Sequence, residues 1–363
     1  MPDRVVHSGP LEAWANRFVE AMGTPADIAA EVARHLVGSN LAGHDSHGVM
    51  RLARYKAEAV AGQLRPHARP ELFRENGVCA IVDAGHGFGH FATMTAMNWC
   101  LERAPARGIA AAAVRHSNHI GRLGEYVERA ASRRMVGLVT VGIAGPGAGL
   151  TAPFGGRTRF LGTNPWAIGV PARGRAPFVM DFATTTVAEG KVKVSRARGA
   201  QLSPGVILDP AGEPATDPEQ LYAGGTLTLL GGRLAGHKGY GLSMAAALVG
   251  ALAMVGDDDP TSAGNSFGDA TGWIAGVFTI AIDPEWFGGR DAYEALVRPV
   301  LASAGAAEPA PDAERVLVPG EPEAISRQRR VGEGITIAEA TWTELEDAST
   351  SLGVPMPDSR PSE

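Results

Sequence analysis

The fold class of this 363-residue chain is decided by residues 78–143, whose apolar runs are Val78-Cys-Ala-Ile-Val-Asp83, Ile109-Ala-Ala-Ala-Ala-Val114 and Val136-Gly-Leu-Val-Thr-Val-Gly-Ile143. The segments between these runs, residues 89–104 and 122–134, are amphipathic and predict helices. Strands that alternate with amphipathic helices predict an α/β fold.

Outward from this stretch, the N-terminal side predicts helices and the C-terminal side predicts helices and strands. Leu11, Trp14, Phe18 and Met22 recur at helical spacing, and Gly23 ends that helix. Further elements are predicted as helices 24–41, 48–61, one beginning near Thr185, 239–255, 291–304 and 337–350, and as strands 109–114, 136–143, 177–181 and 273–282. The tail from Pro355, rich in Pro, Ser and charge, is expected to be disordered.

Composition excludes several classes of protein. Hydrophobic residues make up 45% of the chain, charged residues 20%, and the net charge is −6, as in globular proteins rather than disordered or coiled-coil ones. The chain has no long Lys/Arg tract and only 6% aromatic residues, so nucleic acid is not an expected partner.

The expected location is the cytoplasm. The longest apolar run, Leu242 to Gly256, is shorter than the ~20 residues of a membrane span and predicts a buried helix. The N-terminus carries charges where a signal peptide needs an apolar stretch. Cys79 and Cys100 lie in apolar surroundings without CxxC spacing, which predicts inert core thiols in a reducing compartment.

A first polar cluster, Gly43-His-Asp-Ser-His-Gly48, lies between two predicted helices. Arg51 and Tyr55 follow His47 by four and eight residues, which places them on one helical face. This predicts a polar pocket whose guanidinium binds a carboxylate. The alternative is a capping turn made by Asp45 or Ser46. A serine hydrolase is not supported, because the nucleophile elbow needs Gly where His44 stands.

A second polar cluster, Arg115-His-Ser-Asn-His-Ile-Gly-Arg122, follows a predicted strand. His119 can serve as a general acid/base, and the amides of Gly121 to Leu123 can bind an anion such as a pyrophosphate. The alternative is a structural histidine. The spacing of His44 with His47 and of His116 with His119 also permits a metal site, but no acidic or thiolate ligand completes either pair, and none is predicted.

Nucleotide-binding motifs are weak. Gly85-His-Gly-Phe-Gly89 resembles G-x-G-x-x-G only loosely, because its third Gly comes one residue early. There is no Walker A sequence. A standard Rossmann fold is therefore not predicted.

From about residue 10 to 350, the chain resembles the type-2 malate/L-lactate dehydrogenase family of non-Rossmann NAD(P)-dependent oxidoreductases, above all its hydroxycarboxylate dehydrogenase branch. The resemblance is carried, in this order, by Asp45-Ser-His-Gly-Val-Met-Arg51, His116-Ser-Asn-His-Ile-Gly-Arg-Leu-Gly124, Pro153-Phe-Gly-Gly156, Leu161-Gly-Thr-Asn-Pro165, Asp181-Phe-Ala-Thr-Thr185 and Gly236-His-Lys-Gly-Tyr-Gly241.

The resemblance implies hydride transfer between NAD or NADP and the C2 of a 2-oxo or 2-hydroxy acid. By position, His119 is the expected acid/base, Arg51 binds the substrate carboxylate, and Ser46 and His47 line the substrate and nicotinamide end. The expected contacts of the cofactor are His47, Gly121, Arg122, Leu123, Val179, Met180, Asp181, Phe182, Ala183, Thr184, His237, Lys238, Gly320, Glu321, Pro322 and Glu323.

Some of these positions also have simpler interpretations. Asp181 can accept from ribose hydroxyls or merely cap the helix near Thr185, and Lys238 can bind a phosphate or be a solvated charge. Lys191, Lys193, Arg196 and Arg198 can reach a 2′-phosphate or simply be solvated, so NAD and NADP both stay open.

The resemblance further implies a homodimer and a mixed sheet. The expected domains are a mainly helical one, residues 1–117 completed by 305–363, and a cofactor-binding one, residues 118–304. In the loop 143–149 many members of the family have polar residues, whereas this chain has only Ile, Ala, Gly and Pro there. Val206 stands where a Trp is common in the family. A less polar substrate is therefore expected.

Other functions stay open. A cyclic-imine or N-alkyl amino acid reductase has the same geometry around a C=N bond. A metal-dependent hydrolase or lyase, or a ligand-binding relative without activity, is a more distant alternative.

Overall fold

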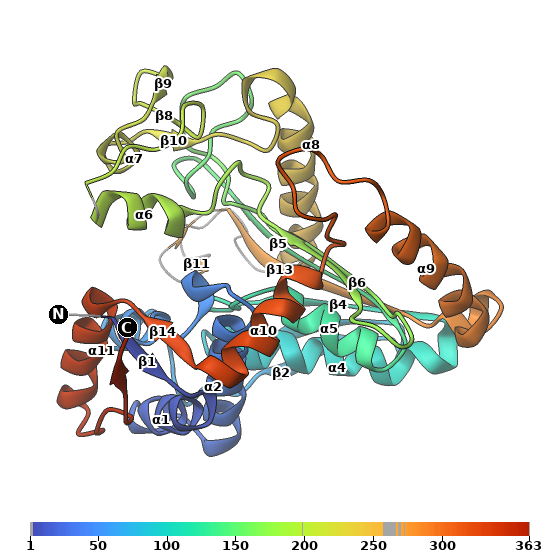
Figure 1. Ribbon diagram of the computed structural model, residues 1–363. Coiled ribbons are helices and arrows are strands. Elements are labelled where there is room, and N and C mark those ends of the chain that lie inside the picture. Colours follow the sequence, from blue (N-terminus) through green and yellow to red (C-terminus); the bar gives the residue numbers. More distant parts are fainter. Residues whose placement is uncertain (1–2, 198, 257–265, 268–269, 272, 363) are drawn as a thin grey trace.

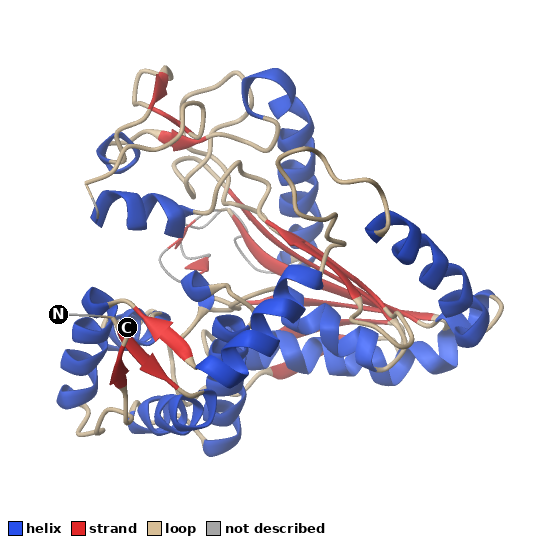
Figure 2. Cartoon of the chain, in the orientation of Figure 1, coloured by secondary structure: helices blue, strands red, loops and turns tan. Residues whose placement is uncertain are grey.

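A seven-stranded mixed sheet forms the centre of the computed structural model, which describes residues 3–197, 199–256, 266–267, 270–271 and 273–362 (Figures 1 and 2). β3 and β4 pair in parallel, and the other neighbours in this sheet are antiparallel. This confirms the α/β class with a mixed sheet. In spatial order the strands are β2 (Glu71–Glu75), β3 (Cys79–Asp83), β4 (Ile109–Arg115), β13 (Ile274–Ile282), β5 (Val136–Ala144), β6 (Trp166–Val170) and β7 (Phe178–Phe182).

Helices cover both faces of this sheet. α4 (Gly89–Arg107) and α5 (Gly124–Ser132) pack on one face, and α8 (Gly232–Gly250) packs on β5 and β13. α8 approaches β5 closely because Gly142 has no side chain: a Cβ there would lie 2.3 Å from the Ala246 carbonyl oxygen. The first strand of the sheet begins at Glu71. Three of its strands, β2, β3 and β4, therefore lie within residues 1–117, the segment that was expected to form a mainly helical domain.

A second core gathers residues from both ends of the chain. Its helices are α1 (Ser8–Ala21), α2 (Ala26–Leu41), α3 (Arg51–Val60) and α11 (Glu339–Ser351), beside a small sheet of β14 (Ile335–Ile337), β1 (Arg4–Val6) and β15 (Arg360–Pro361). Trp14, wholly buried, donates from its indole N–H to Ser349 Oγ at 3.1 Å. Side chains between Val6 and Phe88 thus share a core with those between Ile335 and Val354.

The remaining elements lie outside these cores. A small lobe, residues 189–227, contains α6 (Glu189–Ala197), β8 (Ile207–Leu208), β9 (Pro214–Ala215), α7 (Glu219–Tyr222) and β10 (Thr226–Leu227). It has its own small core of Val192, Ile207, Leu221 and Leu227. α9 (Arg290–Gly305) and α10 (Glu321–Glu333) follow β13. In Figure 1, the small lobe lies above the helices of the second core.

Four expectations are wrong. The tail is not disordered, because Arg360 and Pro361 pair with β1. Cys79, at the start of β3, is exposed, although Cys100 is buried. The run from Leu242 is not a buried helix throughout: Leu248 is 61% exposed. The helix expected near Thr185 begins at Glu189. Among the described residues, no helix combines the length and apolar character that crossing a membrane requires.

Candidate active site

The turn before α3 is held rigidly by neighbouring side chains. The Asn40 amide donates to Asp45 Oδ1 at 2.7 Å and its oxygen accepts from the Val49 amide at 2.9 Å. Arg330 of α10 donates to both Asp45 oxygens, at 2.6 and 3.0 Å. A Cβ on Gly48 would lie 2.2 Å from Asn40 Oδ1, so the turn needs glycine there. Neither Asp45 nor Ser46 caps α3, so the capping alternative is wrong.

This turn brings together the predicted substrate-binding residues. Arg51 Nε donates to the Ser46 carbonyl oxygen at 2.6 Å, and Ser46 Oγ lies 3.0 Å from His47 Nδ1. Within the described part of the chain, Arg51 forms no ion pair. Burial, and next the Arg51 charge, lower the pKa of His47 to about 3. The site therefore offers a guanidinium without a carboxylate partner beside a neutral imidazole.

His119 lies directly against this group, in the loop that follows β4. Its ring stacks on His47, with centroids 5.5 Å apart and planes 22° apart, and its Nδ1 lies 2.7 Å from Tyr55 Oη. Asn118 Oδ1 accepts from the His119 amide at 2.6 Å, while its NH₂ donates to Glu58 at 3.0 Å. Burial, and next the Arg51 charge, lower the pKa of His119. A neutral imidazole is suited to accept a proton.

The glycine-rich stretch 85–89 supports the His119 loop. The His86 amide donates to the His116 carbonyl at 2.7 Å, and the Asn118 amide donates to the Gly87 carbonyl at 3.2 Å. A Cβ on Gly89 would lie 2.1 Å from the Asn118 carbonyl oxygen. The loose resemblance to a dinucleotide motif therefore reflects close packing of two loops.

The histidine pairs that permitted a metal site face different partners. His116 Nδ1 lies 3.1 Å from Asp83, whereas His119 faces Tyr55. His44 Nε2 lies 3.0 Å from Glu323. In the part of the chain that the structure describes, no group of three His, Cys, Asp or Glu residues is arranged to hold a metal ion.

Three of the predicted cofactor segments, at residues 121–124, 179–184 and 320–323, lie together near β7 and the starts of α5 and α10. Asp181 Oδ2 accepts from the Gly124 amide at 2.6 Å, so Asp181 sits at the start of α5 and not at a helix near Thr185. The Val179 amide donates to the Pro319 carbonyl at 3.1 Å. Gly320 has φ +97°, and a Cβ there would lie 2.6 Å from the Pro177 carbonyl oxygen. Burial raises the pKa of Asp181, and the Arg122 charge opposes this.

Three backbone amides of the turn at residues 121–124 already have hydrogen-bond acceptors within the protein, which the sequence does not indicate. The amides of Gly121, Arg122 and Gly124 already donate to His119 Nδ1, His35 Nε2 and Asp181. The Arg122 side chain is buried, bonded to Glu128 and 3.6 Å from Glu125. An anion at these three amides would require those bonds to break.

The basic residues expected near the cofactor lie on two different helices, α8 and α6. His237 and Lys238 lie exposed on α8. The loop before this helix contacts a predicted cofactor segment, because the Leu230 amide donates to the Thr184 carbonyl at 2.9 Å. Arg196 binds both oxygens of Glu219 at 2.7 and 2.9 Å, and Lys193 lies 3.2 Å from Glu189. Arg198 lies outside the described residues.

Several residues of the site were not predicted. His90 lies behind Tyr55, Glu58 anchors Asn118, and a Cβ on Gly190 of α6 would lie 2.8 Å from Ser46 Cβ. Glu58 follows Arg51 by seven residues, so helical spacing was a usable signal for it. Nothing in the local sequence indicates that Gly190 packs on Ser46.

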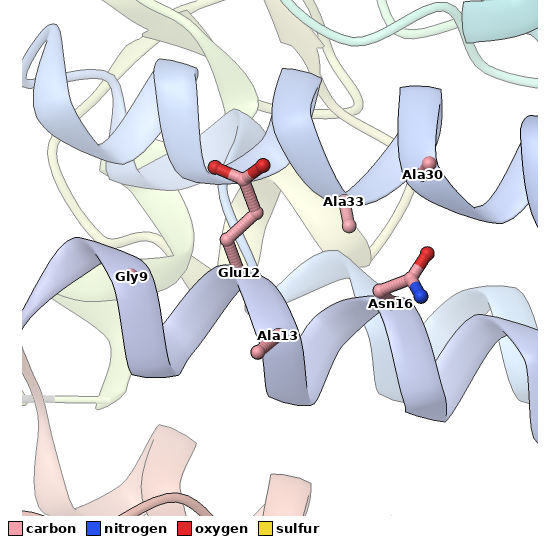
Figure 3. Close-up of a pocket in the computed structure, with 6 residues that line it drawn as sticks. All are labelled: Gly9, Glu12, Ala13, Asn16, Ala30 and Ala33. Carbon is pink, nitrogen blue, oxygen red and sulfur yellow. The ribbon is translucent and has the colours of Figure 1, made fainter.

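A separate pocket lies between α1 and α2, away from this site (Figure 3). Its volume is about 330 Å³, and its lining is Gly9, Glu12, Ala13, Asn16, Ala30 and Ala33. With one titratable side chain and no histidine or arginine in this lining, it offers none of the groups described above.

Known proteins resemble the chain over nearly its whole length. Hydroxycarboxylate dehydrogenase B of Escherichia coli (strain K12) is 32% identical over 348 residues, 95% of this chain and 93% of that protein. Delta(1)-pyrroline-2-carboxylate reductase of Ancylobacter novellus is 33% identical over 329 residues, 90% of this chain and 92% of that protein. The structure of malate dehydrogenase from Pyrococcus horikoshii OT3 superposes with a TM-score of 0.85, at 29% identity, covering 98% of this chain and 97% of that one. The malate/L-lactate dehydrogenase family matches residues 6–346, and the chain belongs to this family.

Proposed function

We propose that the protein is an NAD(P)-dependent oxidoreductase that interconverts a 2-oxo acid and the corresponding 2-hydroxy acid. The observation that carries this proposal is the arrangement of His119, His47 and Arg51. An acid/base imidazole stacked on a neutral imidazole, next to a guanidinium that forms no ion pair with the described residues, suits a substrate whose reacting oxygen is adjacent to a carboxylate.

The residues present fit a nicotinamide dinucleotide. The half-buried carboxylates of Asp181 and Glu323 are acceptors for hydroxyl groups, and Lys238 and His237 are exposed donors for phosphates. When bound, the nicotinamide supplies or takes up a hydride. The residues that would hold it lie in segments 179–184, 237–238 and 320–323, with His47 at the nicotinamide end, and in segment 121–124, whose Gly121, Arg122 and Gly124 amides would first have to give up their present acceptors. Nothing in this donor set selects NAD over NADP.

The chain's own groups then bind the substrate and move the proton. Arg51 binds the carboxylate, and His119 Nε2 takes the proton from the C2 hydroxyl during oxidation or returns it during reduction. The Arg51 charge lowers the pKa of His119, after burial. A bound carboxylate offsets that charge and raises the pKa again, which favours protonation of His119 once a substrate is bound.

A carbonyl substrate is favoured over an imine. A C=N bond that is already protonated on nitrogen needs no acid, whereas an oxygen at C2 must receive a proton when hydride arrives. His119, held by Tyr55, is built to supply that proton. The reductase among the relatives keeps the imine as the second candidate.

The experiment is a nicotinamide absorbance assay with NADH and NADPH against pyruvate, oxaloacetate, phenylpyruvate and 2-oxoglutarate, each with and without methylamine. Turnover without methylamine is expected, and turnover only with methylamine would favour the imine reductase. We expect His119→Ala to lower kcat/KM by about 10²-fold or more, and His67→Ala, at an exposed position, to leave it unchanged. Binding of neither nucleotide in a titration would overturn the proposal.

We also propose a homodimer that buries the outer side of α8. Leu234, Leu248, Leu252 and Val255, of α8 and the turn after it, are 93%, 61%, 49% and 54% exposed. A second copy suits this apolar stripe, because exposed apolar patches mark interaction sites and two-fold symmetric dimers are the commonest oligomers of soluble proteins. Light scattering should give twice the monomer mass for the native chain and the monomer mass for Leu248→Glu. A native monomer would refute the dimer.

A further inference from the structure

We infer that Tyr55 is a positioning residue, whose hydroxyl group holds His119 Nδ1 so that Nε2 is presented to the oxygen of the substrate. This rests on the proposed function, because it assigns the group that stabilises the acid/base of that reaction.

The contacts of Tyr55 are short and buried. Its side chain is 0% exposed, and its Oη lies 2.7 Å from His119 Nδ1 and 3.3 Å from His90 Nε2. A phenol hydroxyl has one hydrogen to donate and lone pairs to accept with. It can therefore serve both imidazoles at once, donating to one and accepting from the other.

A hydroxyl can stabilise the tautomer of His119 that the reaction needs. Nε2 can take a proton from the substrate only when the hydrogen of the neutral ring is on Nδ1, and Tyr55 Oη then accepts from that Nδ1–H. When Nε2 has taken the proton, Nδ1 keeps its hydrogen, and the same bond to Tyr55 stabilises the positive ring. In both states the hydroxyl hydrogen of Tyr55 is available to His90 Nε2.

Among the described residues, no other contact of His119 Nδ1 offers this acceptor. The Gly121 amide, 3.3 Å from Nδ1, is a donor and opposes a hydrogen there. The charged or titratable groups that face His119 are Arg51 and Arg54 of α3, His47 and His90, and each disfavours a positive ring. Glu58 is taken up by Arg54 and Asn118. Tyr55 thus has the place that an aspartate has in a Ser-His-Asp triad.

His90 completes the arrangement from the other side. It is 0% exposed, and burial lowers its pKa, so it stays neutral and can take the Tyr55 hydrogen. The ring of His35 lies edge-on to it at 4.8 Å. Contacts of the Tyr55 ring with Phe88 and His90, at centroid distances of 5.9 and 5.5 Å, fix the direction of the hydroxyl.

The test is Tyr55→Phe, with Tyr126→Phe as the matched control. Tyr126 is equally buried, but its hydroxyl donates to the Ile120 carbonyl at 2.5 Å and does not touch His119. For Tyr55→Phe we expect kcat for 2-oxo acid reduction to fall about 10–100-fold, as for loss of a hydrogen bond to a charged group. The alkaline limb of its pH profile should move to lower pH. The control should lose a similar amount of thermal stability without a shift of that limb.

A second readout does not depend on turnover. ¹⁵N NMR of labelled histidines reports how the proton is shared between Nδ1 and Nε2 of His119, identified by its loss in His119→Ala. Tyr55→Phe should change that pattern, and Tyr126→Phe should not. An unmoved pH profile with an unchanged ¹⁵N pattern, or equal shifts in both variants, would overturn the inference. If the native enzyme reduces no 2-oxo acid, the proposed function fails, and the ¹⁵N comparison alone decides whether Tyr55 holds His119.

Discussion

Arg51 has two effects at once, because one guanidinium both attracts a carboxylate and acts on the nearby imidazoles. After burial, its charge is the next cause that lowers the pKa of His119. In Arg51→Gln this positive neighbour is gone, so the pKa of His119 rises. For oxidation of a hydroxy acid the neutral ring is active, and the acid limb of the pH profile should therefore move to higher pH.

The same change should raise the substrate KM by about 10-fold or more, since a charge-assisted hydrogen bond is lost. Arg69→Gln removes an exposed arginine, paired with Asp27, and should change neither quantity. A higher KM with an unmoved acid limb would show that Arg51 binds the carboxylate without influencing His119.

At this scale, residues close together in the sequence were predictable and distant contacts were not. Ser46, His47 and Arg51 lie within one turn and the start of one helix, and local spacing is enough to group them. The contact of Tyr55 with His119 joins positions 64 apart, and no periodicity reports such a distance.

Between elements, the packing of α4 on the His119 loop depends on Gly89. A Cβ at this position would lie 2.1 Å from the backbone oxygen of Asn118, which cannot rotate away. We expect Gly89→Ala to destabilise the protein by about 1–3 kcal/mol and to lower kcat, because the loop that carries His119 must shift. Gly9 lies in α1, and a Cβ added there would have no atom within 4 Å. We expect Gly9→Ala to leave the free energy of unfolding unchanged or to raise it by up to about 1 kcal/mol. Urea unfolding of both variants measures the difference, and equal stabilities would contradict it.

α10 holds the substrate-binding turn through Arg330 and Asp45. Arg330→Ala should raise the substrate KM about 5–30-fold, because loss of the paired hydrogen bonds at 2.6 and 3.0 Å removes roughly 1–2 kcal/mol. Arg329→Ala, on the same helix, loses only an exposed contact of 3.9 Å with Glu333 and should have the native KM. Equal KM values in the two variants would show that the turn holds its shape without α10.

Elements with clear apolar patterns were predictable, and short or polar ones were not. The predicted helix 24–41 and strand 136–143 differ from α2 and β5 by no more than two residues at either end. α10 was missed because none of its side chains is buried, so it has no apolar stripe. β8, β9 and β10 have two residues each, too few for alternation to show.

For the whole molecule, buried histidines predict loss of stability in mild acid. His35 and His90 are 0% exposed, and burial holds the pKa of each well below its usual value near 6.5. Below pH 6.5 these two histidines bind protons in the unfolded chain but stay neutral in the folded protein. Each such group therefore removes about 1.4 kcal/mol per pH unit. Carboxylates with lowered pKa, such as Asp83, act at more acidic pH, so the interval from 6.5 to 5 reports the histidines.

Urea unfolding should show a constant free energy from pH 7 to 8 and a steep decrease from 6.5 to 5. His67→Ala, at an exposed position, should have the same slope as the native protein. A free energy independent of pH over that interval would mean that the buried rings are protonated in the folded state.

The order of the central sheet was beyond prediction, although its mixed character followed from the family resemblance. β13, residues 274–282, inserts between β4 and β5, which end 130 or more residues earlier. Strand lengths and periodicity are local quantities, whereas this insertion is set by packing across the whole chain.

The pairing of β1 with β14 and β15 determines when the protein can finish folding during synthesis. Arg4 leaves the ribosome long before Ile337 and Pro361, the residues it pairs with. At typical translation rates the delay is roughly 20–70 s. The indole N–H of Trp14 likewise has no partner until Ser349 has been synthesised. For that time the apolar faces of α1 and α2 lack part of their cover, so the nascent chain passes through a stage at which a chaperone has an exposed surface to bind.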